Sequence, residues 1–314
     1  MKKALIVGCE GQDGFYLKKN LESRGYEIIG VDKNVTFSST KGDMALIDIL
    51  KEDQVFKLLS DFQPDEIYFL AAFHQSSEDV KVDDFFVFKK SIDVNINALM
   101  FFLEGIRAKS KHSKLFYAAS SHIFGNPDKE EQDENTPVKP NCIYGITKAA
   151  GLNICRYYRN NHSVNASVGI LYNHESPLRK SIFVSKKIVE GAIAIRNKSD
   201  NKLVVGDLSA TIDWGYAPDY VEAMHTILQL SEADEFIISS GVLHTVKDFV
   251  SGVFDYLDLD WEKYVIENSN ILTKKNKKNL KGNSTKLQMT TGWEPKISFT
   301  ELIKIMVDSC MQQL

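Results

Sequence analysis

Cysteine is scarce in this sequence. The four cysteines among 314 residues lie far apart and show no Cys-x-x-Cys spacing (Cys9, Cys142, Cys155 and Cys310). This argues against a metal site or a disulfide framework and fits a reducing cytoplasm. Long apolar runs are also absent: none reaches about 18 residues, so we expect no membrane span. The first apolar run stops at Gly8, too early for a signal peptide.

The chain also lacks an excess of positive charge. Its 38 Lys and Arg stand against 42 Asp and Glu, giving a net charge of -4, which disfavours a dedicated nucleic-acid binder. Its 43% hydrophobic and 11% aromatic residues argue against disorder. The length indicates one large domain or two interlocked ones.

In the first half, apolar runs alternate with helical patterns. We predict strands at residues 4–7, 27–31, 66–70, 114–118 and 166–171, a strand and a helix within 44–62, and helices at 15–24, 87–109 and 141–160. Such alternation predicts an α/β fold with a parallel sheet covered on both faces.

The second half is less regular. We predict a helix at 182–196, a strand at 203–205 and a final helix from Ser298 through Met306, with Ser298 and Glu301 forming a capping box. Residues 274–286 contain six lysines. This segment is either a solvated surface loop or a lid over an anionic ligand.

A glycine-rich loop follows the first strand. Gly8, Gly11 and Gly14 are spaced Gly-x-x-Gly-x-x-Gly, with Gln12 and Asp13 between the last two. Small residues let backbone N–H groups approach a pyrophosphate, and the next helix presents its positive end to the same anion. The position between a strand and a helix predicts dinucleotide binding.

Acidic residues further on bear on which dinucleotide binds. Asp32 ends the second strand, 24 positions after Gly8, where a carboxylate bonds the ribose hydroxyls of NAD and repels the 2′-phosphate of NADP. The neighbouring Lys33 softens this preference, so we expect NAD ahead of NADP. Asp48 and Ile49 are placed at the end of a third strand, where Asp48 either bonds the adenine amino group or caps a turn.

Three residues suit redox chemistry at an alcohol carbon. Tyr144 and Lys148 are four apart on one helix face, and Ser120 follows a strand. The ammonium favours the tyrosine phenolate, which can act as a base, and the serine aligns the substrate oxygen. The combination with the glycine loop predicts an enzyme.

These motifs resemble the extended short-chain dehydrogenase/reductases that act on nucleotide sugars, most of all the GDP-mannose 4,6-dehydratases. The resemblance covers essentially the whole chain. It rests on residues 11–14, 70–72, 169–177, 213–215, 219–221 and 291–295, of which Asn-His-Glu-Ser-Pro at 173–177 is the most specific.

The resemblance implies a Rossmann-type doubly wound sheet with a smaller mixed α/β C-terminal substrate domain. The cofactor domain would comprise residues 1–172 and roughly 208–244, and the nucleotide-sugar domain residues 173–207 and 245–314. It also adds cofactor residues and substrate residues to the predicted site. The former are Leu70, Ala71 and Ala72; the latter are Ser121, Asn173, Arg179, Ser185, Lys186 and Lys187.

The family's chemistry gives Tyr144 and one further residue their roles. Tyr144 would take the proton of the sugar 4-hydroxyl while hydride passes to the nicotinamide. A glutamate then removes the C5 proton and protonates the departing 6-hydroxyl, and the hydride returns to C6. In this chain the glutamate position holds His122.

His122 leaves three alternatives open. Histidine can act as base and then acid, so elimination survives. Alternatively, the enzyme has lost dehydration and is a nucleotide-sugar reductase or epimerase. As a third alternative, His122 only fills space. A different class, a non-catalytic dinucleotide sensor, would not need Ser120, Tyr144 and Lys148.

Two further departures concern phosphate and assembly. Ile212 stands where the family has an arginine that neutralises a phosphate, which leaves the nucleotide uncertain. The short segment between Asp32 and Asp48 lacks the family's arginine-rich insert. The absence of this insert favours NAD as the cofactor and a homodimer as the assembly. The dimer would form through the helices near 87–109 and 141–160. We expect His74 to be a loop histidine and Cys142 a small packed residue, while His174 is either structural or lines the substrate site.

Overall fold

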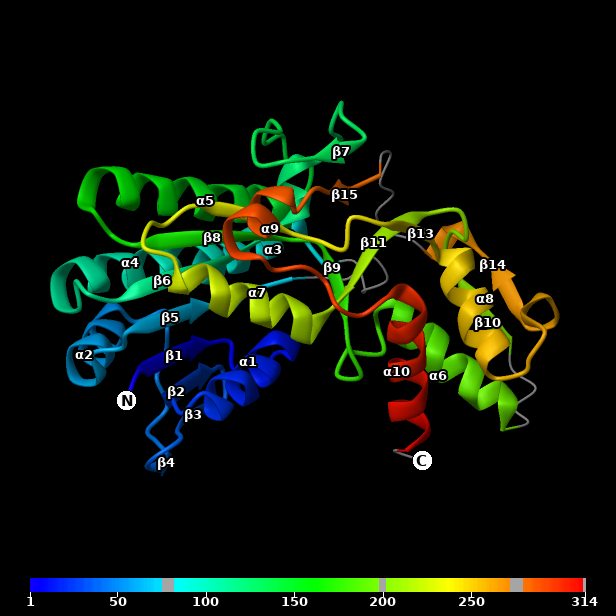
Figure 1. Ribbon diagram of the computed structural model, residues 1–314, viewed down its shortest axis with the longest axis horizontal. Helices are drawn as coiled ribbons and strands as arrows, with labels where there is room; N and C mark the ends of the chain where they lie inside the picture. The colour runs from blue at the N-terminus through cyan, green and yellow to red at the C-terminus, as the bar shows by residue number, and fades with distance from the viewer. Residues whose placement is uncertain (75–81, 198–201, 272–278, 313–314) are drawn as a thin grey trace.

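A large mixed sheet forms the centre of the computed structural model, which describes residues 1–74, 82–197, 202–271 and 279–312 (Figure 1). Its eight strands are β1 (Lys3–Val7), β2 (Glu27–Asp32), β3 (Val35–Ser38), β4 (Gly42–Asp43), β5 (Glu66–Phe69), β6 (Lys114–Ser120), β8 (Ala166–Leu171) and β12 (Glu235–Ile238). They lie in the order β12-β8-β6-β5-β1-β2-β3-β4. Pairing is parallel from β12 to β2 and antiparallel from β2 to β4.

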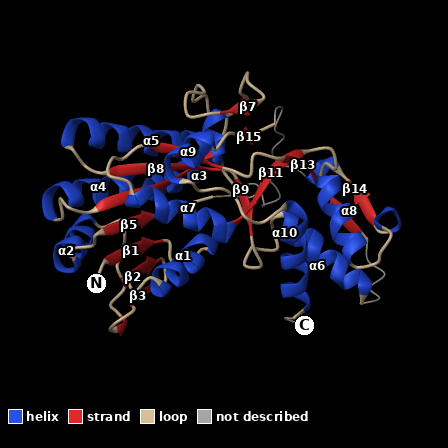
Figure 2. Ribbon diagram, in the orientation of Figure 1, coloured by secondary structure: helices blue, strands red, loops and turns tan. Residues whose placement is uncertain are grey.

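Helices cover both faces of this sheet, so that three layers are visible (Figure 2). On one face lie α2 (Glu52–Phe62), α4 (Ala98–Lys109) and α5 (Ile143–His162), and on the other α1 (Gln12–Ser23), α7 (Ala217–Gln229) and α9 (Thr285–Thr291). The alternation of β1 explains the two cores. Leu5 and Val7 face the first set of helices, while Ala4 and Ile6 face the second.

A second unit packs beyond the end of the sheet. Its core joins α6 (Val184–Arg196), α8 (Val246–Tyr256) and α10 (Phe299–Met311). Small sheets complete it and link it to the first unit: β10 (Leu203–Val205) with β14 (Val265–Glu267); β9 (Asn173–Glu175), β11 (Thr211–Tyr216) and β13 (Leu243–Thr245); and β7 (Glu131–Gln132) with β15 (Lys281–Gly282). Short helical turns are η2 (Ser121–Phe124), η3 (Trp261–Lys263) and η4 (Ser269–Ile271).

The fold class predicted from the sequence is confirmed as a Rossmann-type α/β fold, but one predicted strand is wrong. Residues 44–51 form no strand before α2. Instead Val35–Ser38 turns back after only two residues and pairs antiparallel with β2. So short a connection permits an antiparallel hairpin and not a parallel crossover. Asp48 therefore does not end a strand of the sheet.

The helix predicted at 87–109 is longer and less regular than expected. It begins at α3 (Asp84–Ile92), whose N-cap Asp83 accepts a hydrogen bond from Phe86 N, and passes through a π-helical turn, η1 (Asp93–Asn97), into α4. The final capping box of Ser298 and Glu301 is present. Within the described residues, no helix is long and apolar enough to cross a membrane.

Candidate active site

The glycine loop lies at the carboxyl end of β1, between the neighbouring ends of β2 and β5. Gly8 has φ +95°, and a Cβ on Gly14 would lie 2.3 Å from the Gly8 carbonyl oxygen, so side chains are excluded at both. Ala71 N donates to Val7 O, which brings the Leu70–Ala72 segment against Gly8. Strand order reverses at β1, the place where such sheets bind ligands. Gly11 is the N-cap of α1.

The predicted cofactor carboxylates have different surroundings. Asp32, at the end of β2, accepts hydrogen bonds from Glu10 N at 3.0 Å and Lys33 N at 2.8 Å. Its carboxylate thus lies beside the glycine loop. Asp48 is exposed, and its carboxylate accepts a hydrogen bond from Leu50 N at 2.9 Å, as in a turn. Ile49 packs against the core under β1.

Ser120, Tyr144 and Lys148 meet next to that loop. Ser120 ends β6 and is hydrogen-bonded to Tyr144, near the start of α5. Lys148, one turn along α5, is buried and donates to Ala118 O at 2.6 Å. Its Nζ lies 5.7 Å from the centre of the Tyr144 ring. The structure thus brings together the three residues that the sequence placed on a strand end and a helix face.

Burial sets the charge state of this group in the protein alone. Burial lowers the pKa of Lys148 to about 7. Burial first, and then the charge of Asp13, raise the pKa of Tyr144 above its ordinary value, while the hydrogen bond with Ser120 opposes them. A positive charge bound beside the ring would act against this upward shift of the Tyr144 pKa.

Two imidazoles flank Tyr144. The His122 ring, in η2, lies 6.0 Å from the Tyr144 ring and nearly perpendicular to it. His74, which follows β5, approaches the same ring to 4.5 Å and stacks on Phe183 at 6.0 Å. The guanidinium of Arg179 covers Phe183 at 3.7 Å. The aromatic contacts of His74 go beyond those expected of a loop histidine, and no spacing in the sequence indicates them.

The predicted substrate residues lie around β9 and the start of α6. Asn173 is partly exposed in β9, and Ser121 is buried in η2. Two of the others contact Glu175: Arg179 forms an ion pair with it at 3.0 Å, and Ser185 Oγ donates a hydrogen bond to it at 2.6 Å. Lys186 donates a hydrogen bond to Pro177 O at 3.0 Å, and Lys187 is partly buried. Glu175 therefore organises this side of the site, a role that the sequence did not indicate.

Asn95 is a supporting residue that sequence reasoning missed. It is fully buried in η1, accepts a hydrogen bond from Phe73 N at 2.8 Å, and donates to Thr147 at 2.9 Å. Thr147 lies between Tyr144 and Lys148 on α5. Asn95 therefore fixes the segment after β5 relative to α5.

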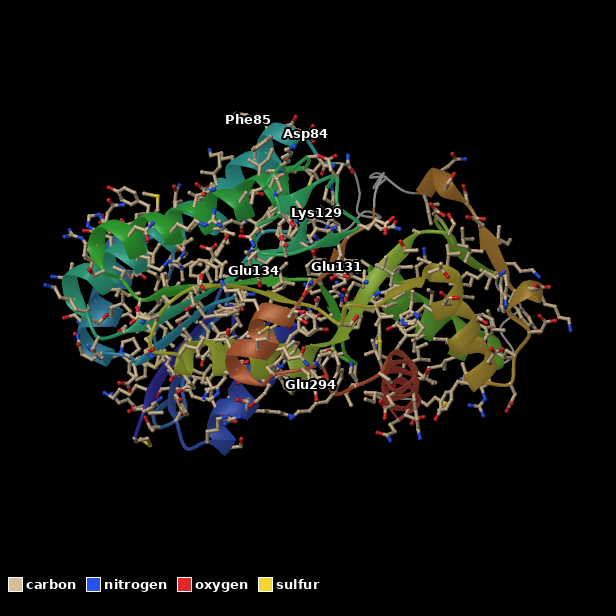
Figure 3. All side chains as sticks on the ribbon, turned by 45° about the horizontal axis from the view of Figure 1, so that its top comes forward. Asp84, Phe85, Lys129, Glu131, Glu134 and Glu294 are labelled. Atoms are coloured by element: carbon tan, nitrogen blue, oxygen red, sulfur yellow. The ribbon has the colours of Figure 1, made fainter. Side chains whose placement is uncertain are left out.

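Residues 274–278 of the lysine-rich segment 274–286, with four of its six lysines, lie outside the described residues. Its two described lysines contact carboxylates of the protein: Lys281 pairs with Glu131 at 2.6 Å and Lys286 with Asp234 at 2.5 Å. Figure 3 shows Glu131 near Lys129 and Glu134. Both described lysines are thus engaged with carboxylates of the protein.

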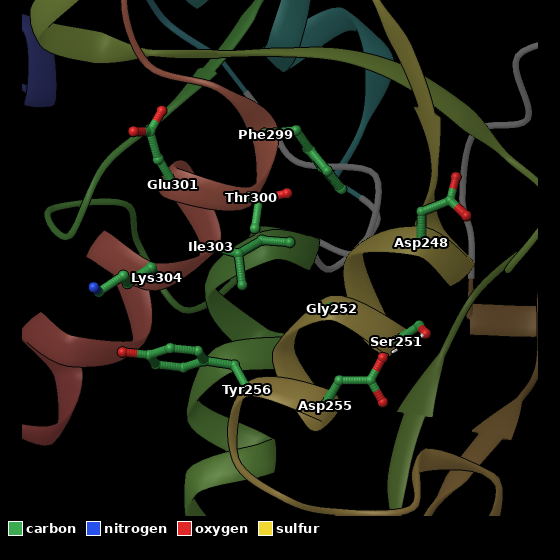
Figure 4. Close-up of a pocket in the computed structure, with 10 residues that line it drawn as sticks. All are labelled: Asp248, Ser251, Gly252, Asp255, Tyr256, Phe299, Thr300, Glu301, Ile303 and Lys304. Carbon is green, nitrogen blue, oxygen red and sulfur yellow. Dashed lines mark hydrogen bonds between the residues drawn. The ribbon is translucent and has the colours of Figure 1, made fainter.

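A surface cavity of about 370 Å³ lies elsewhere, between α8 and α10 of the second unit (Figure 4). Two of its carboxylates, Asp248 and Glu301, close capping boxes with Thr245 and Ser298. A third, Asp255, is hydrogen-bonded by Ser251. These groups stabilise helix ends, and the cavity contains none of the predicted site residues.

Comparison with known proteins decides the family. A family model described as GDP-mannose 4,6 dehydratase matches residues 5–306. The chain belongs to this family. GDP-mannose 4,6 dehydratase 1 of Arabidopsis thaliana is 32% identical over 331 residues, covering 99% of this chain and 90% of the relative. The resemblance noted in the sequence, and the enzyme class that it implied, are confirmed.

Solved structures agree with this fold at lower identity. The dTDP-glucose 4,6-dehydratase of Bacillus anthracis in complex with NAD has a TM-score of 0.83 at 18% identity, covering 99% of this chain and 97% of that one. RMD from Pseudomonas aeruginosa complexed with NADPH has a TM-score of 0.82 at 17% identity, covering 100% of both chains. Such likeness establishes the shared architecture.

Proposed function

We propose that this protein is an NAD-dependent GDP-sugar 4,6-dehydratase in which His122 replaces the usual glutamate. The observation that carries the proposal is the meeting of Ser120, Tyr144 and Lys148 beside the glycine loop, with the His122 ring 6.0 Å from that of Tyr144. The choice of a GDP-sugar rests on the names of the relatives.

The residues present fit a dinucleotide. Gly8 and Gly14 let the loop pack closely between β1 and α1, so that the start of α1 can present its backbone N–H groups to a pyrophosphate. Asp32 lies beside this loop, where a ribose would bond. The Asp32 carboxylate favours NAD over NADP because a 2′-phosphate would meet a negative charge. When bound, the nicotinamide supplies the acceptor for a hydride from C4 and its return to C6. Lys148 would hold the nicotinamide ribose.

The protein's own residues then move protons. Ser120 orients the sugar 4-hydroxyl, and Tyr144 removes its proton as C4 is oxidised. The ketone acidifies the C5 proton, which His122 removes through its neutral imidazole. The resulting imidazolium protonates the 6-hydroxyl as it leaves as water, so His122 ends the step as it began. Each role suits a histidine because its ordinary pKa is near neutrality.

The substrate side of the site is proposed from β9 and the segments after it. Asn173 would contact the diphosphate, and Ser121, Arg179, Ser185, Lys186 and Lys187 would line or support the pocket. Because Ser185 and Lys186 are engaged within the protein, we assign them a supporting part. We keep the division into a cofactor domain (1–172 with 208–244) and a substrate domain (173–207 with 245–314).

An exposed apolar face supports assembly as a homodimer. Phe85, Phe86, Ile92 and Met100 on the α3–α4 helix, and Ile146 and Tyr157 on α5, are all exposed large hydrophobic residues. Figure 3 shows Phe85 at the outer surface. Two such helices from each of two subunits would cover this face as a four-helix bundle.

A reductase or epimerase is the second candidate, because His122 departs from the family's glutamate. The two functions separate by cofactor balance. A dehydratase converts its substrate to a 4-keto-6-deoxy sugar without net cofactor use, and a reductase consumes NAD(P)H stoichiometrically. Incubation with GDP-, CDP-, UDP- and dTDP-hexoses, followed by mass spectrometry, tests the proposal. Loss of water from none of them would refute it.

A further inference from the structure

His174 contacts an acceptor through each of its ring nitrogens. Its Nδ1 lies 2.7 Å from Tyr172 O, and its Nε2 lies 3.0 Å from both carboxylate oxygens of Asp13. A carbonyl oxygen only accepts, and so does an ionised carboxylate. Both nitrogens must therefore carry protons, and the pair is an imidazolium with a carboxylate. The side chains are only 12% and 20% exposed.

Asp13 places a negative charge close to the predicted anion site. It lies in the first turn of α1, the helix whose start faces the predicted pyrophosphate. The helix end supplies the equivalent of about half a positive charge, so a lone carboxylate there would leave the anion site net negative. The imidazolium of His174 restores a net positive charge.

We propose that the Asp13–His174 ion pair is a charge lock: His174 neutralises Asp13 so that the start of α1 can accept an anionic dinucleotide, and it ties the glycine loop to β9. His174 is thus a positioning residue. This inference rests on the proposed binding of a dinucleotide. It adds to that proposal the residue that keeps the start of α1 able to bind an anion.

The surroundings of the pair support this role. The His174 ring stacks on Tyr220 of α7 at 4.6 Å, and Arg179 is the other charged group that acts on it. Burial and Arg179 act to lower the pKa of His174, but Asp13 outweighs them and the pKa is raised. In turn, His174 helps to lower the pKa of Asp13.

The lock also acts on the catalytic group. The negative charge of Asp13 adds to the burial that raises the pKa of Tyr144, and it opposes the burial that lowers the pKa of Lys148. With His174 protonated, the field of Asp13 at these groups is reduced. Loss of the imidazolium would therefore disfavour the phenolate of Tyr144 as well as the bound anion.

A pair of uncharged hydrogen bonds also connects the start of α1 with the segment that contains His174, and it provides a matched control. The Gln12 side chain donates to His174 O at 3.1 Å, and Ser176 Oγ donates to Gln12 Oε1 at 2.8 Å. Replacing Ser176 by alanine weakens this connection and leaves the charge balance of the loop unchanged. It thus separates loss of a local contact from loss of charge.

The first experiment measures NAD affinity by titration calorimetry on the full chain, for wild type, His174→Gln, Asp13→Asn/His174→Gln and Ser176→Ala. We expect His174→Gln to weaken binding by about tenfold or more, because a carboxylate near the pyrophosphate becomes unpaired. The double variant should recover most of that loss. A double variant as weak as His174→Gln would overturn the inference, and so would Ser176→Ala having the same effect as His174→Gln. Thermal unfolding of each variant shows that it is folded.

The pH dependence of NAD affinity distinguishes the proposed role of His174 from a merely structural one. Wild-type affinity should fall as pH rises through the raised pKa of His174, where the imidazolium is lost. The double variant should lack this titration, and its persistence there would contradict the proposal.

Nuclear magnetic resonance of the cofactor-free protein separates this inference from the proposed function. Two protonated ring nitrogens on His174 at neutral pH are expected, and a neutral ring would overturn the charge lock even if NAD binds. If wild type binds no nicotinamide dinucleotide, the proposed function fails, while the resonance result still decides the ion pair.

Discussion

The imidazole of His122 and the phenol ring of Tyr144 lie nearly perpendicular, with their centroids 6.0 Å apart. Ser120 contacts both residues, because its hydroxyl accepts a hydrogen bond from the backbone N–H of His122 at 3.3 Å and is hydrogen-bonded to the Tyr144 side chain. The residue that departs from the family pattern therefore lies beside Tyr144, the group that begins the proposed reaction. This geometry makes His122 a direct candidate for the acid/base of elimination.

Replacing His122 by asparagine tests that role. We expect loss of the dehydrated product by at least about 100-fold, the usual contribution of an acid/base group, while oxidation at C4 persists. Reduced cofactor should then accumulate and be visible by its absorbance. His122→Glu, which restores the family residue, should retain dehydration. Unchanged product formation by His122→Asn would make His122 a packing residue.

Lys148 predicts a pH-dependent stability. Because burial lowers its pKa to about 7, the unfolded chain binds more protons than the folded one between pH 7 and the ordinary lysine value of 10.5. The destabilising effect of Lys148 is thus full below pH 7 and disappears as pH rises toward 10.5. Lys148→Met should raise the Tm of the cofactor-free protein by roughly 2–4 °C at pH 7 and less at pH 10. An increase that is the same at both values would contradict this account.

Asp32 sets the expected choice of cofactor. Replacing it by alanine removes the carboxylate that lies beside Glu10 N and the partner of the ribose hydroxyls. We expect the Kd for NAD to rise and that for NADP to fall, since the repulsion of a 2′-phosphate is relieved. Fluorescence titration with both dinucleotides measures the ratio. If wild type binds NADP more tightly than NAD, the assignment to Asp32 is wrong.

The apolar face of α3 predicts the response of the assembly to a charge. Phe85 is 76% exposed, and Phe85→Asp should dissociate the dimer because each subunit would bury an unpaired carboxylate. Met289 on α9 is 83% exposed away from this face, so Met289→Asp is a matched control. Analytical ultracentrifugation gives the mass of each. Dimers from both variants, or a monomeric wild type, would exclude this interface.

Much of the nucleotide-binding unit could be predicted from the sequence because its signals are local. An apolar run, a glycine spacing and a Tyr-x-x-x-Lys pair each depend only on residues that are close together in the sequence. The parallel strands, the capping box of Ser298 and the meeting of Tyr144 with Lys148 followed from such signals. The hairpin of β3 with β2 did not, because the predicted strand was placed after it.

The contacts that complete the site depend on tertiary packing. Asn95 with Phe73, and Asp13 with His174, join segments that no spacing rule connects. In the second unit α6, β10 and α10 were predicted, but β9, β11 and β13 were missed, because these strands are short and pair across long separations. His174 was expected to be structural or to line the substrate site, and only the structure shows its contact with Asp13.

The central claim is that this chain dehydrates a GDP-sugar with the cofactor regenerated in each turnover. The most direct measurement incubates the purified protein with NAD and GDP-mannose, with Tyr144→Phe as the inactive control, and follows product mass and cofactor absorbance together. We expect a product that has lost one water, many turnovers per NAD and no net NADH. A product of unchanged mass, or stoichiometric consumption of cofactor, would contradict the claim.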